Sequence, residues 1–374
     1  MELPFATLDV FTSTRLEGNP LAVVTVPRAL KGELSQAAKL KIAQEFNLSE
    51  TVFLHEAAAD AAGGESRTVD IFTTGREIPF AGHPTIGTAV YCLHHESEGS
   101  GSDGGAGSGS LKTLVTKAGP IPITSSASRV VSAQIPHNVR IHANTLGDVL
   151  SSRSSPSSSS KPLPAAGGTA WVVPAQPAEQ PAVSGLSSDP TIRAAELAAP
   201  VVSIVNGMTF LLVRLDSLEA LGKVEVAALD YDKLSPGKGG EEKHLLDEGW
   251  RDSLVARYYY VDVPSSAASS VMAGDRVDAE AVRNLRTRMI EFNMEDPATG
   301  SAASALACYL SLTADDQGCE RRKFVMTQGV EMGRKSVISL ETTTTRKEGS
   351  GDVAIGEVHL GGTAVVVMKG VLAV

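Results

Sequence analysis

The strongest constraint on the fold is a short motif that occurs twice along the chain. His83–Val90 (HPTIGTAV) aligns without gaps on Asp296–Ala303 (DPATGSAA), and an apolar segment follows each copy. Upstream, RTVDIF beginning at Arg67 resembles RTRMIEF beginning at Arg286. Two matched elements in the same order indicate a duplicated unit, with two helices related by a pseudo-twofold axis.

The second copy has the composition of a helix start that leaves backbone groups open. In MEDPATGSAASALACYL, Asp296 is a favourable N-cap and Pro297 a favourable first helical residue. The small residues that follow leave first-turn N–H groups uncovered, and such groups bind anions. In pseudo-symmetric halves two helix starts converge at an interface, each with about half a positive charge. This predicts an anion site flanked by His83 and Asp296, whose alternative role is helix capping alone.

The remaining pattern predicts an α+β fold in which strands outnumber helices. Helices are expected at 33–46, with Asn47 as its C-cap, and from Pro84 to about Leu93. Ser- and Gly-rich stretches at 97–110 and 151–168 cannot bury apolar area, and a weaker candidate of this kind is 235–244. Strands are expected at 3–12, 19–26, 50–54, 67–73, 201–215, 255–263 and 363–374.

Length and charge restrict the function. A chain of 374 residues can hold two cores, which we place at 1–127 and 128–362, with an insert at about 151–192. The net charge of −10 argues against nucleic-acid partners and anionic membranes, and no apolar run is long enough to span a bilayer. We therefore expect a cytoplasmic protein. The three cysteines, Cys92, Cys308 and Cys319, lack the spacing of a disulfide framework or zinc site, so no metal is expected.

A further candidate is Glu50 in NLSETVFL, where a polar turn enters an apolar strand. A carboxyl group in half-apolar surroundings has a raised pKa, which suits a general acid/base near neutrality. The alternative is a solvated glutamate at a strand end. Glu77 and Glu295 are equally ambiguous on local sequence.

Five motifs resemble one known family. In chain order they are FTSTRLEGNPLAVV, IAQEFNLSETVFL, IFTTGREIPFAGHPTIGTA, EDPATGSAA and QGVEMGRKS. They are similar to the phenazine-biosynthesis (PhzF-type) isomerase-like family, which shares its fold with diaminopimelate epimerase. The resemblance covers nearly the whole chain apart from the Ser/Gly-rich inserts.

The resemblance implies two similar halves, each a curved antiparallel sheet wrapped around a central helix. The central helices would begin at His83-Pro84 and Asp296-Pro297, and residues 363–374 would return to the first half. It also implies a homodimer.

The resemblance further implies a cofactor-free isomerase acting on a small carboxylate substrate. Glu50 would be the catalytic acid/base, with His83 and Asp296 orienting the substrate and relaying protons. Asn19, Gly82, Gly300 and Ser301 would bind the substrate, the last three near backbone N–H groups that hold its carboxylate. The epimerases of this fold use paired cysteines at the helix starts, where this chain has none, so a two-thiol racemase is not expected.

Two departures from the family pattern lie near the expected site. The segment between Arg286 and Asp296 is short and lacks a Phe-x-Pro turn, and Lys335 stands where proline is common. Either change could alter substrate choice. Two alternatives stay open: a dehydratase or cyclase that begins with the same Glu50 proton transfer, and a non-catalytic metabolite-binding protein of the same fold.

Overall fold

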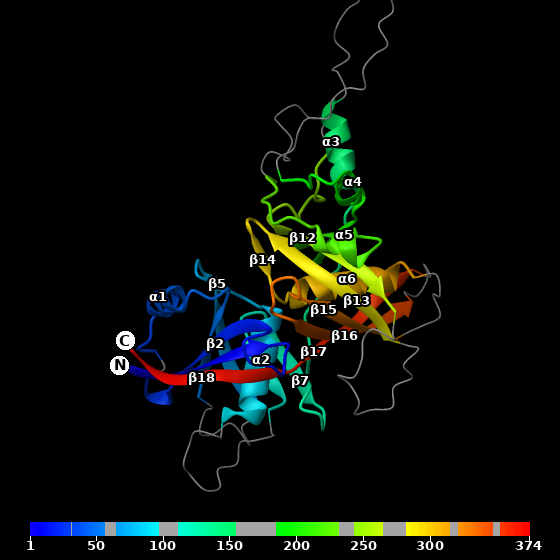
Figure 1. Ribbon diagram of the computed structural model, residues 1–374. Helices are drawn as coiled ribbons and strands as arrows, with labels where there is room; N and C mark the ends of the chain where they lie inside the picture. The colour runs from blue at the N-terminus through cyan, green and yellow to red at the C-terminus, as the bar shows by residue number, and fades with distance from the viewer. Residues whose placement is uncertain are drawn as a thin grey trace, which may run out of the picture.

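The computed structural model describes most of the chain. Much of each low-complexity stretch, together with Cys319, lies outside the described residues. The described ranges are 1–30, 32–56, 65–96, 111–154, 185–231, 243–264, 282–314, 321–346 and 352–374. Within them strands outnumber helices (Figure 1), as the α+β prediction requires.

The first half of the chain is built around helix α2. Its elements are β1 (Glu2–Val10), β2 (Asn19–Val26), the 3₁₀ helix η1 (Arg28–Leu30), α1 (Gln36–Phe46), β3 (Thr51–His55), β4 (Ser66–Phe72), β5 (Glu77–Ile78), α2 (Gly82–His94), β6 (Thr113–Thr116), β7 (Gly119–Ser125) and β8 (Val131–Gln134). Before α2, β1 pairs antiparallel with β2, β2 parallel with β3, and β3 antiparallel with β4. After α2, β6 pairs parallel with β4 and antiparallel with β7.

The second half repeats this order of pairings around helix α6. Its elements are β9 (Arg140–Ile141), α3 (Leu146–Ser154), α4 (Pro190–Ala198), β10 (Val201–Val205), β11 (Met208–Arg214), α5 (Leu218–Gly222), β12 (Leu254–Val263), β13 (Val282–Glu291), β14 (Met294–Asp296), α6 (Gly300–Leu312), β15 (Arg321–Gln328), β16 (Ser336–Arg346), β17 (Val353–Gly362) and β18 (Ala364–Ala373). Strands β10 to β13 pair antiparallel, parallel and antiparallel in turn, and β15 pairs parallel with β13. The shared order accounts for the duplicated sequence motif.

Two connections join the halves. Strand β8 pairs with β7 of the first half and with β17 of the second. The last strand, β18, pairs along the whole length of β1. The division of the chain near residue 127 stays a prediction, because β8, which follows that point, belongs to both ladders.

Local sequence explains the first helix. The hydroxyl of Ser35 accepts a hydrogen bond from the backbone N–H of Ala38, and Asn47 ends the helix in the left-handed conformation with φ 50°. The predicted helix and its C-cap are therefore confirmed, with a start three residues later than expected. The helix covers one face of β2, whose other face packs toward α2. This double cover explains why β2 lacks polar alternation.

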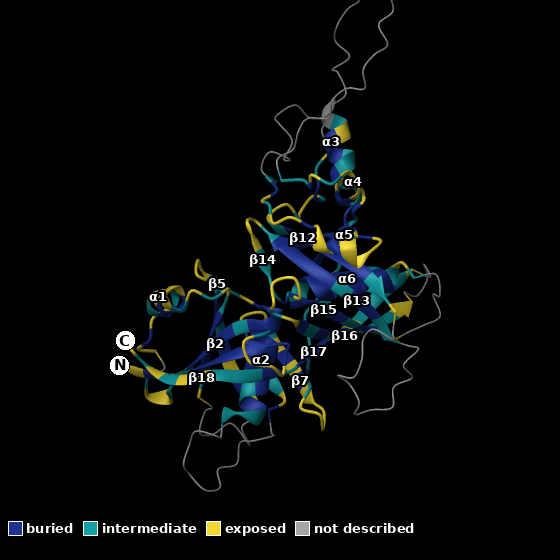
Figure 2. Ribbon diagram, viewed as in Figure 1, coloured by how far each residue is buried: buried dark blue, intermediate teal, exposed yellow. Residues whose placement is uncertain are grey.

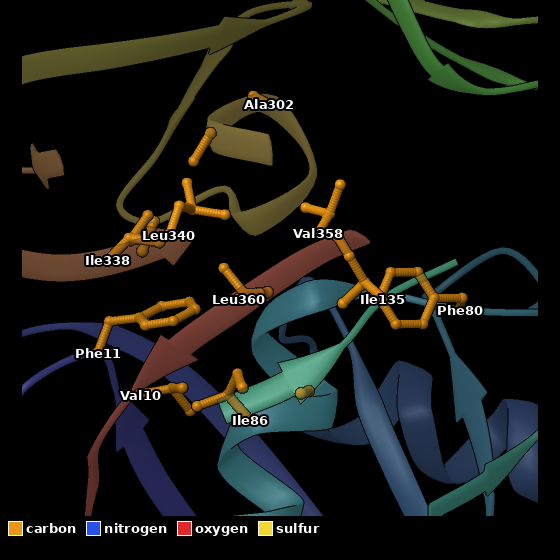
Figure 3. Packing of buried hydrophobic residues seen from close by; sticks show 14 of the residues in the cluster. Val10, Phe11, Phe80, Ile86, Ile135, Ala302, Ile338, Leu340, Val358 and Leu360 are labelled. Carbon is orange, nitrogen blue, oxygen red and sulfur yellow. The ribbon is translucent and has the colours of Figure 1, made fainter. Parts of the chain in front are cut away.

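The two central helices lie inside the core. Nearly every residue of α2 and α6 is buried (Figure 2), as expected for helices that are apolar on all sides. Leu360 of β17 packs between the two helix starts (Figure 3), where its methyl group would lie 3.0 Å from a Cβ atom on Gly82 and 2.8 Å from one on Gly300. The buried Cys92 and Cys308 belong to the same core and are free thiols, as predicted.

The predicted start of the second central helix is wrong. Helix α6 begins at Gly300 after Thr299, whereas Asp296 is the last residue of β14 and neither caps the helix nor precedes its first turn directly. The backbone of Asp296 is held in the β13 ladder opposite Met289, which prevents it from starting a helix. The first central helix likewise begins at Gly82, one residue before His83.

The gap-free alignment of the two motifs is therefore displaced by five residues. Both helices have 13 residues and begin at glycine, and a Cβ atom on Gly82 would lie 3.1 Å from the Cα atom of Gly300. These two glycines are the structural counterparts. It follows that His83 corresponds to Ser301 and not to Asp296, which lies before the start of α6.

A third layer covers the outer face of the second half. Helices α3, α4 and α5 lie on the side away from the first half (Figure 1), over an apolar cluster that includes Val201, Val213 and Tyr259. The guanidinium of Arg257 contacts the carboxylate of Glu196 at 2.9 Å, and both side chains are almost fully buried. In the described part of the chain, no helix has the length and apolar character needed to cross a membrane.

Candidate active site at the two helix starts

Glu50 and His83 come together at the start of α2. Glu50 precedes β3, and His83 is the second residue of the helix. The distance between Oε2 of Glu50 and Nε2 of His83 is 3.6 Å, too long for a hydrogen bond. Both atoms are buried and have no partner among the described residues. Two unpartnered polar atoms that face the same point mark a place where a bound molecule could supply the missing hydrogen bonds.

Asp296 reaches the same region from the second half. Its carboxylate accepts a hydrogen bond of 2.9 Å from the side-chain amide of Asn19 and a short one from the hydroxyl of Thr299. The amide of Asn19 also donates to the carbonyl of Ala298 at 2.9 Å. Asn19, the first residue of β2, thus links the first half to the segment that enters α6.

Behind Asp296 lies a polar network that the sequence analysis missed. The side-chain amide of Gln328 donates to the backbone carbonyl of Asp296 at 2.8 Å and to the hydroxyl of Thr299 at 3.1 Å. The buried hydroxyl of Tyr258 donates to the amide oxygen of Gln328 at 3.0 Å. The network fixes the loop between β14 and α6. Gln328 opens the quoted motif QGVEMGRKS, so its place in that motif was the available signal.

The helix starts offer backbone donors. Gly82 and Gly300 lie so close that a side chain on either would meet the other, and Ser301 follows on α6. No hydrogen bond within the described structure occupies the N–H groups of these three residues. Open N–H groups at two adjoining helix starts are the arrangement that an anion site requires, so the anion site stays a prediction at this place.

Burial controls the charge states of the three titratable groups. It raises the pKa of the Glu50 carboxyl, an effect that a hydrogen bond with Ser49 partly offsets. It lowers the pKa of His83 to about 4, although the neighbouring Asp296 carboxylate opposes the change. Burial also raises the pKa of Asp296, while His83 and the hydrogen bonds from Thr299 and Asn19 act against it. His83 is therefore neutral near pH 7, and the carboxyl groups hold their protons to higher pH than usual.

The two ambiguous glutamates have structural roles. Glu77 forms an ion pair of 2.9 Å with Lys117 on the surface. Glu295 forms a buried ion pair of 2.7 Å with Arg288 on the outer face of β14, opposite to the face of Asp296. Neither joins the site.

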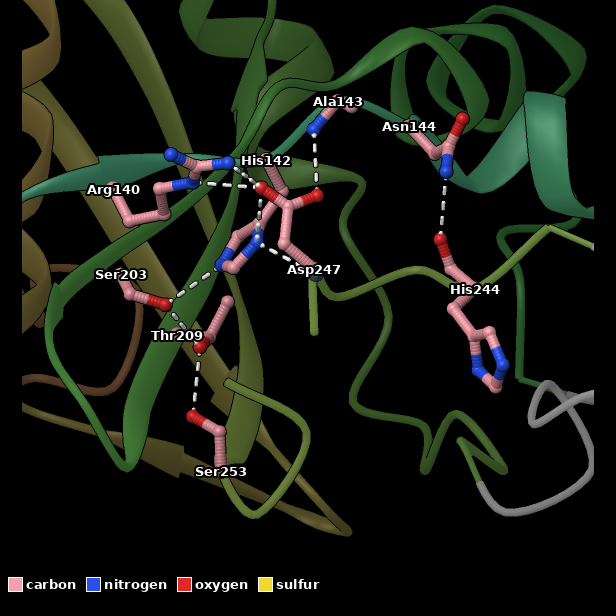
Figure 4. Close-up of polar contacts among 9 residues, drawn as sticks. All are labelled: Arg140, His142, Ala143, Asn144, Ser203, Thr209, His244, Asp247 and Ser253. Atoms are coloured by element: carbon pink, nitrogen blue, oxygen red, sulfur yellow. Dashed lines mark hydrogen bonds and ion pairs between the residues drawn. The ribbon is translucent and has the colours of Figure 1, made fainter. Parts of the chain in front are cut away.

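A second polar cluster, around His142, has the residue types of a hydrolase triad (Figure 4). The backbone N–H of Asp247 donates to Nδ1 of His142 at 3.1 Å, so the ring proton lies on Nε2, which donates to the hydroxyl of Ser203 at 2.9 Å. A donating nitrogen cannot act as a base toward that serine, and Ser203 is fully buried. From Ser203 the hydroxyl chain continues to Thr209 and Ser253. The cluster fastens β9, β10 and β11 together.

The described residues include no group of three or more His, Cys, Asp or Glu side chains that could hold a metal ion. Cys92 and Cys308 lie within α2 and α6 rather than at their starts. Burial raises the pKa of each thiol to about 12, so both are protonated near neutrality.

Comparison with known proteins identifies the class of protein. The chain is 30% identical over 372 residues to an uncharacterized isomerase of Mesorhizobium japonicum, covering 97% of this chain and 96% of that protein. It is 27% identical over 367 residues to trans-2,3-dihydro-3-hydroxyanthranilate isomerase of Pseudomonas aeruginosa, covering 96% of each. Because both relatives are named as isomerases, the class of protein is an isomerase.

The family follows from a sequence model. The model of the phenazine biosynthesis-like protein family matches residues 8–205 and 262–370. The chain belongs to the phenazine biosynthesis-like protein family, which confirms the resemblance drawn from the five motifs.

Solved structures support the fold. A PhzF-family phenazine biosynthesis protein of Bacillus anthracis matches with a TM-score of 0.59 at 17% identity, covering all of both chains. A predicted epimerase of Pseudomonas aeruginosa matches with a TM-score of 0.56 at 20% identity, covering 100% of this chain and 99% of that one.

Proposed function

We propose that the protein is a cofactor-independent isomerase that moves a proton between carbon atoms of a small unsaturated carboxylate, with Glu50 as general acid/base. The observation that carries the proposal is the pair of buried, unpartnered atoms, Oε2 of Glu50 and Nε2 of His83, beside open N–H groups at two helix starts. The family relatives named as isomerases support the reaction class.

The chemistry needs only side chains and backbone groups. Ionised Glu50 takes a proton from an activated carbon, so that a C–H bond breaks and an O–H bond forms. The electron pair moves into the conjugated system toward the substrate carboxylate, where the N–H groups near Gly82 and Gly300 stabilise the growing charge. Glu50 then returns a proton to another carbon. The atoms of substrate and product are the same.

His83 and Asp296 would serve this reaction by position. His83, neutral at pH 7, can donate or accept one hydrogen bond to the substrate. Asp296 is held by Asn19 and Thr299, and it can accept a bond from a polar substrate group. His83 lies in the first half and Asp296 in the second, so a substrate that contacts both residues would bridge the two halves.

The test uses trans-2,3-dihydro-3-hydroxyanthranilate, the compound in the name of the Pseudomonas aeruginosa relative, as the probe. Proton NMR in D₂O follows conversion and deuterium uptake for the wild type and Glu50→Gln. We expect conversion with deuterium incorporation in the wild type, and a rate at least about 100-fold lower in the variant. The matched control is Glu45→Gln, at an exposed carboxyl on α1, which should keep the wild-type rate.

Each other outcome selects another hypothesis. Conversion that survives Glu50→Gln rejects Glu50 as the base. A Glu50-dependent product that has lost the mass of water indicates a dehydratase. Binding without any conversion favours a metabolite-binding protein over an enzyme for this compound.

A further inference from the structure

Glu291 lies on the same face of the β13–β14 hairpin as Asp296. In this hairpin Met289 is opposite Asp296, and Glu291 is opposite Met294. Residues directly opposite each other, and residues two apart on one strand, point to one face of an antiparallel pair. The carboxyl groups of Glu291 and Asp296 therefore project from one face, while Glu295 projects from the other.

Glu291 points toward the core side of the second half. Met289, two residues before it on the same face, belongs to the apolar cluster that contains the buried residues of α6. In the first half, the last pair of the β4–β5 ladder contains Phe72, which points the other way, into the cluster under α1, and packs edge-to-face on Phe53 with ring centroids 5.4 Å apart. The second half thus places a carboxyl group on its core side, at a cost in stability that a binding role would explain.

The carboxyl of Glu291 has no partner in the described structure. The three arginines that precede it on β13 are engaged elsewhere: Arg283 with Asp262 at 2.6 Å, Arg286 with Glu331 at 2.6 Å, and Arg288 with Glu295 at 2.7 Å. Burial, together with the charges of Asp296 and Glu50, raises the pKa of Glu291 to about 7. Glu291 therefore interacts electrostatically with both carboxylates of the site, Glu50 in the first half and Asp296 in the second.

We propose that Glu291 is a specificity-determining residue of the site, whose carboxyl accepts a hydrogen bond from a donor group on the ligand, either an ammonium or a hydroxyl. In the ligand, this donor group is separate from the carboxylate, which binds at the helix starts of Gly82 and Gly300. The inference rests on the proposed function, because it needs that carboxylate to be bound there.

The experiment measures binding of three probes at pH 8 by titration calorimetry: benzoate, 3-hydroxybenzoate and 3-(aminomethyl)benzoate. Benzoate reports the anion site alone, and the other two add a hydroxyl or an ammonium donor. The proteins are the wild type, Glu291→Gln, Glu291→Phe and the control Glu45→Gln. Melting temperatures verify that each variant is folded.

We expect the wild type and Glu45→Gln to bind one or both donor probes about tenfold more tightly than benzoate. Glu291→Phe should remove this preference and leave benzoate affinity unchanged. Glu291→Gln distinguishes the donors, since its amide oxygen still accepts from a hydroxyl but lacks the charge that attracts an ammonium.

Two negative results have different meanings. If benzoate binds and Glu291→Phe keeps the wild-type preference, or the wild type shows none, the role of Glu291 is rejected and the anion site stands. If no probe binds the wild type, the anion site of the proposed function is rejected, and the inference is rejected with it.

Discussion

At the scale of single residues, the environment of His83 determines which groups can titrate near neutrality. An ordinary histidine changes charge near pH 6.5, but burial lowers the pKa of His83 to about 4. Burial acts in the opposite direction on Glu50, whose pKa is raised. The two neighbours are consequently both uncharged over part of the weakly acidic range, in contrast to the ion pair that their residue types suggest.

This arrangement predicts the pH profile of the enzyme. As pH falls, kcat/KM should decrease with a midpoint above 4.5, because Glu50 must be ionised to accept a proton. His83→Asn should lower the rate without removing that limb. Initial rates from pH 4 to 8 check this, and a limb near pH 6.5 that vanishes in His83→Asn would show that the histidine titrates normally.

Glu291 gives a prediction about stability. Its pKa is raised from 4.5 to about 7 on folding, so the folded state holds its proton more tightly than the unfolded state. Stability from this group is therefore lost as pH rises from 4.5 through 7. Glu291→Gln should match the wild type at pH 4 and exceed it by up to about 3 kcal/mol at pH 8. Urea unfolding measures the difference.

The control for this prediction is Glu45→Gln on the exposed side of α1. This variant removes a solvent-exposed glutamate and so accounts for the effect of the substitution itself on urea unfolding. A gap between Glu291→Gln and the wild type that does not widen with pH would contradict the raised pKa.

Sequence could identify Glu50, His83 and Asp296 because each lies in a recognisable local motif. It could not identify Tyr258, whose contact with Gln328 comes from a strand distant along the chain, and it did not single out Gln328, although that residue opens a quoted motif. Sequence did not single out Glu291, because the face to which this residue points depends on the pairing of β13 with β14.

At the scale of elements, the approach of the two helix starts depends on glycine. A Cβ atom on Gly82 would lie 3.1 Å from the Cα atom of Gly300 and 3.0 Å from a methyl of Leu360. Because the Cα atom of Gly300 belongs to the backbone, it has little freedom to move away from such a Cβ atom. The pair thus fixes the spacing between two sets of N–H donors.

Gly82→Ala should destabilise the protein by about 1–3 kcal/mol through overpacking. It should also lower kcat/KM, because the helix starts must separate. The control is Gly75→Ala, since a Cβ there would meet only the hydroxyl of Thr73 at 3.8 Å. Thermal unfolding and initial rates check both effects, and equal behaviour of the two variants would contradict the close approach.

The elements also show where local signals failed. Asp-Pro reads as a helix start in isolation, yet the short strand β14 takes Asp296 into a ladder, and tertiary pairing overrides the capping preference. The second hairpin has a two-residue turn, Phe292 and Asn293, where the first has four residues, but its ladder is one pair longer. Most of the apparent shortening of this segment came from the displaced alignment, since Arg286 and Ser301 are 15 positions apart (301 − 286) and Arg67 and His83 are 16 apart (83 − 67).

At the scale of the whole molecule, one buried ion pair attaches the outer layer to the second half. The carboxylate of Glu196 on α4 accepts bonds from Arg257, from Tyr259 at 2.5 Å and from the backbone of Ser187 at 2.8 Å. Removing one charge leaves the other buried without compensation. Such pairs cannot be foreseen from sequence, because 61 residues separate the two partners.

Glu196→Gln should reduce the free energy of unfolding by about 3–5 kcal/mol, because Arg257 stays charged and buried. The activity per folded molecule should be unchanged, since the pair lies outside the site. Glu219→Gln, which removes an exposed partner of Lys223, should leave the free energy of unfolding almost unchanged, because solvent screens that pair. Denaturant titrations compare the two, and similar losses would contradict the structural role of the buried pair.

The pairing of β18 with β1 has a consequence for how the chain is made. Strand β1 is translated well before β18, its neighbour along the far edge, because the rest of both halves lies between them in the chain. Until β18 is made, the first half has an open strand edge, which is a template for pairing with other chains. At synthesis rates of about 5–20 residues per second, that exposure lasts for on the order of tens of seconds. Nascent chains are therefore vulnerable to aggregation while the second half is being translated, because the first half still lacks a strand.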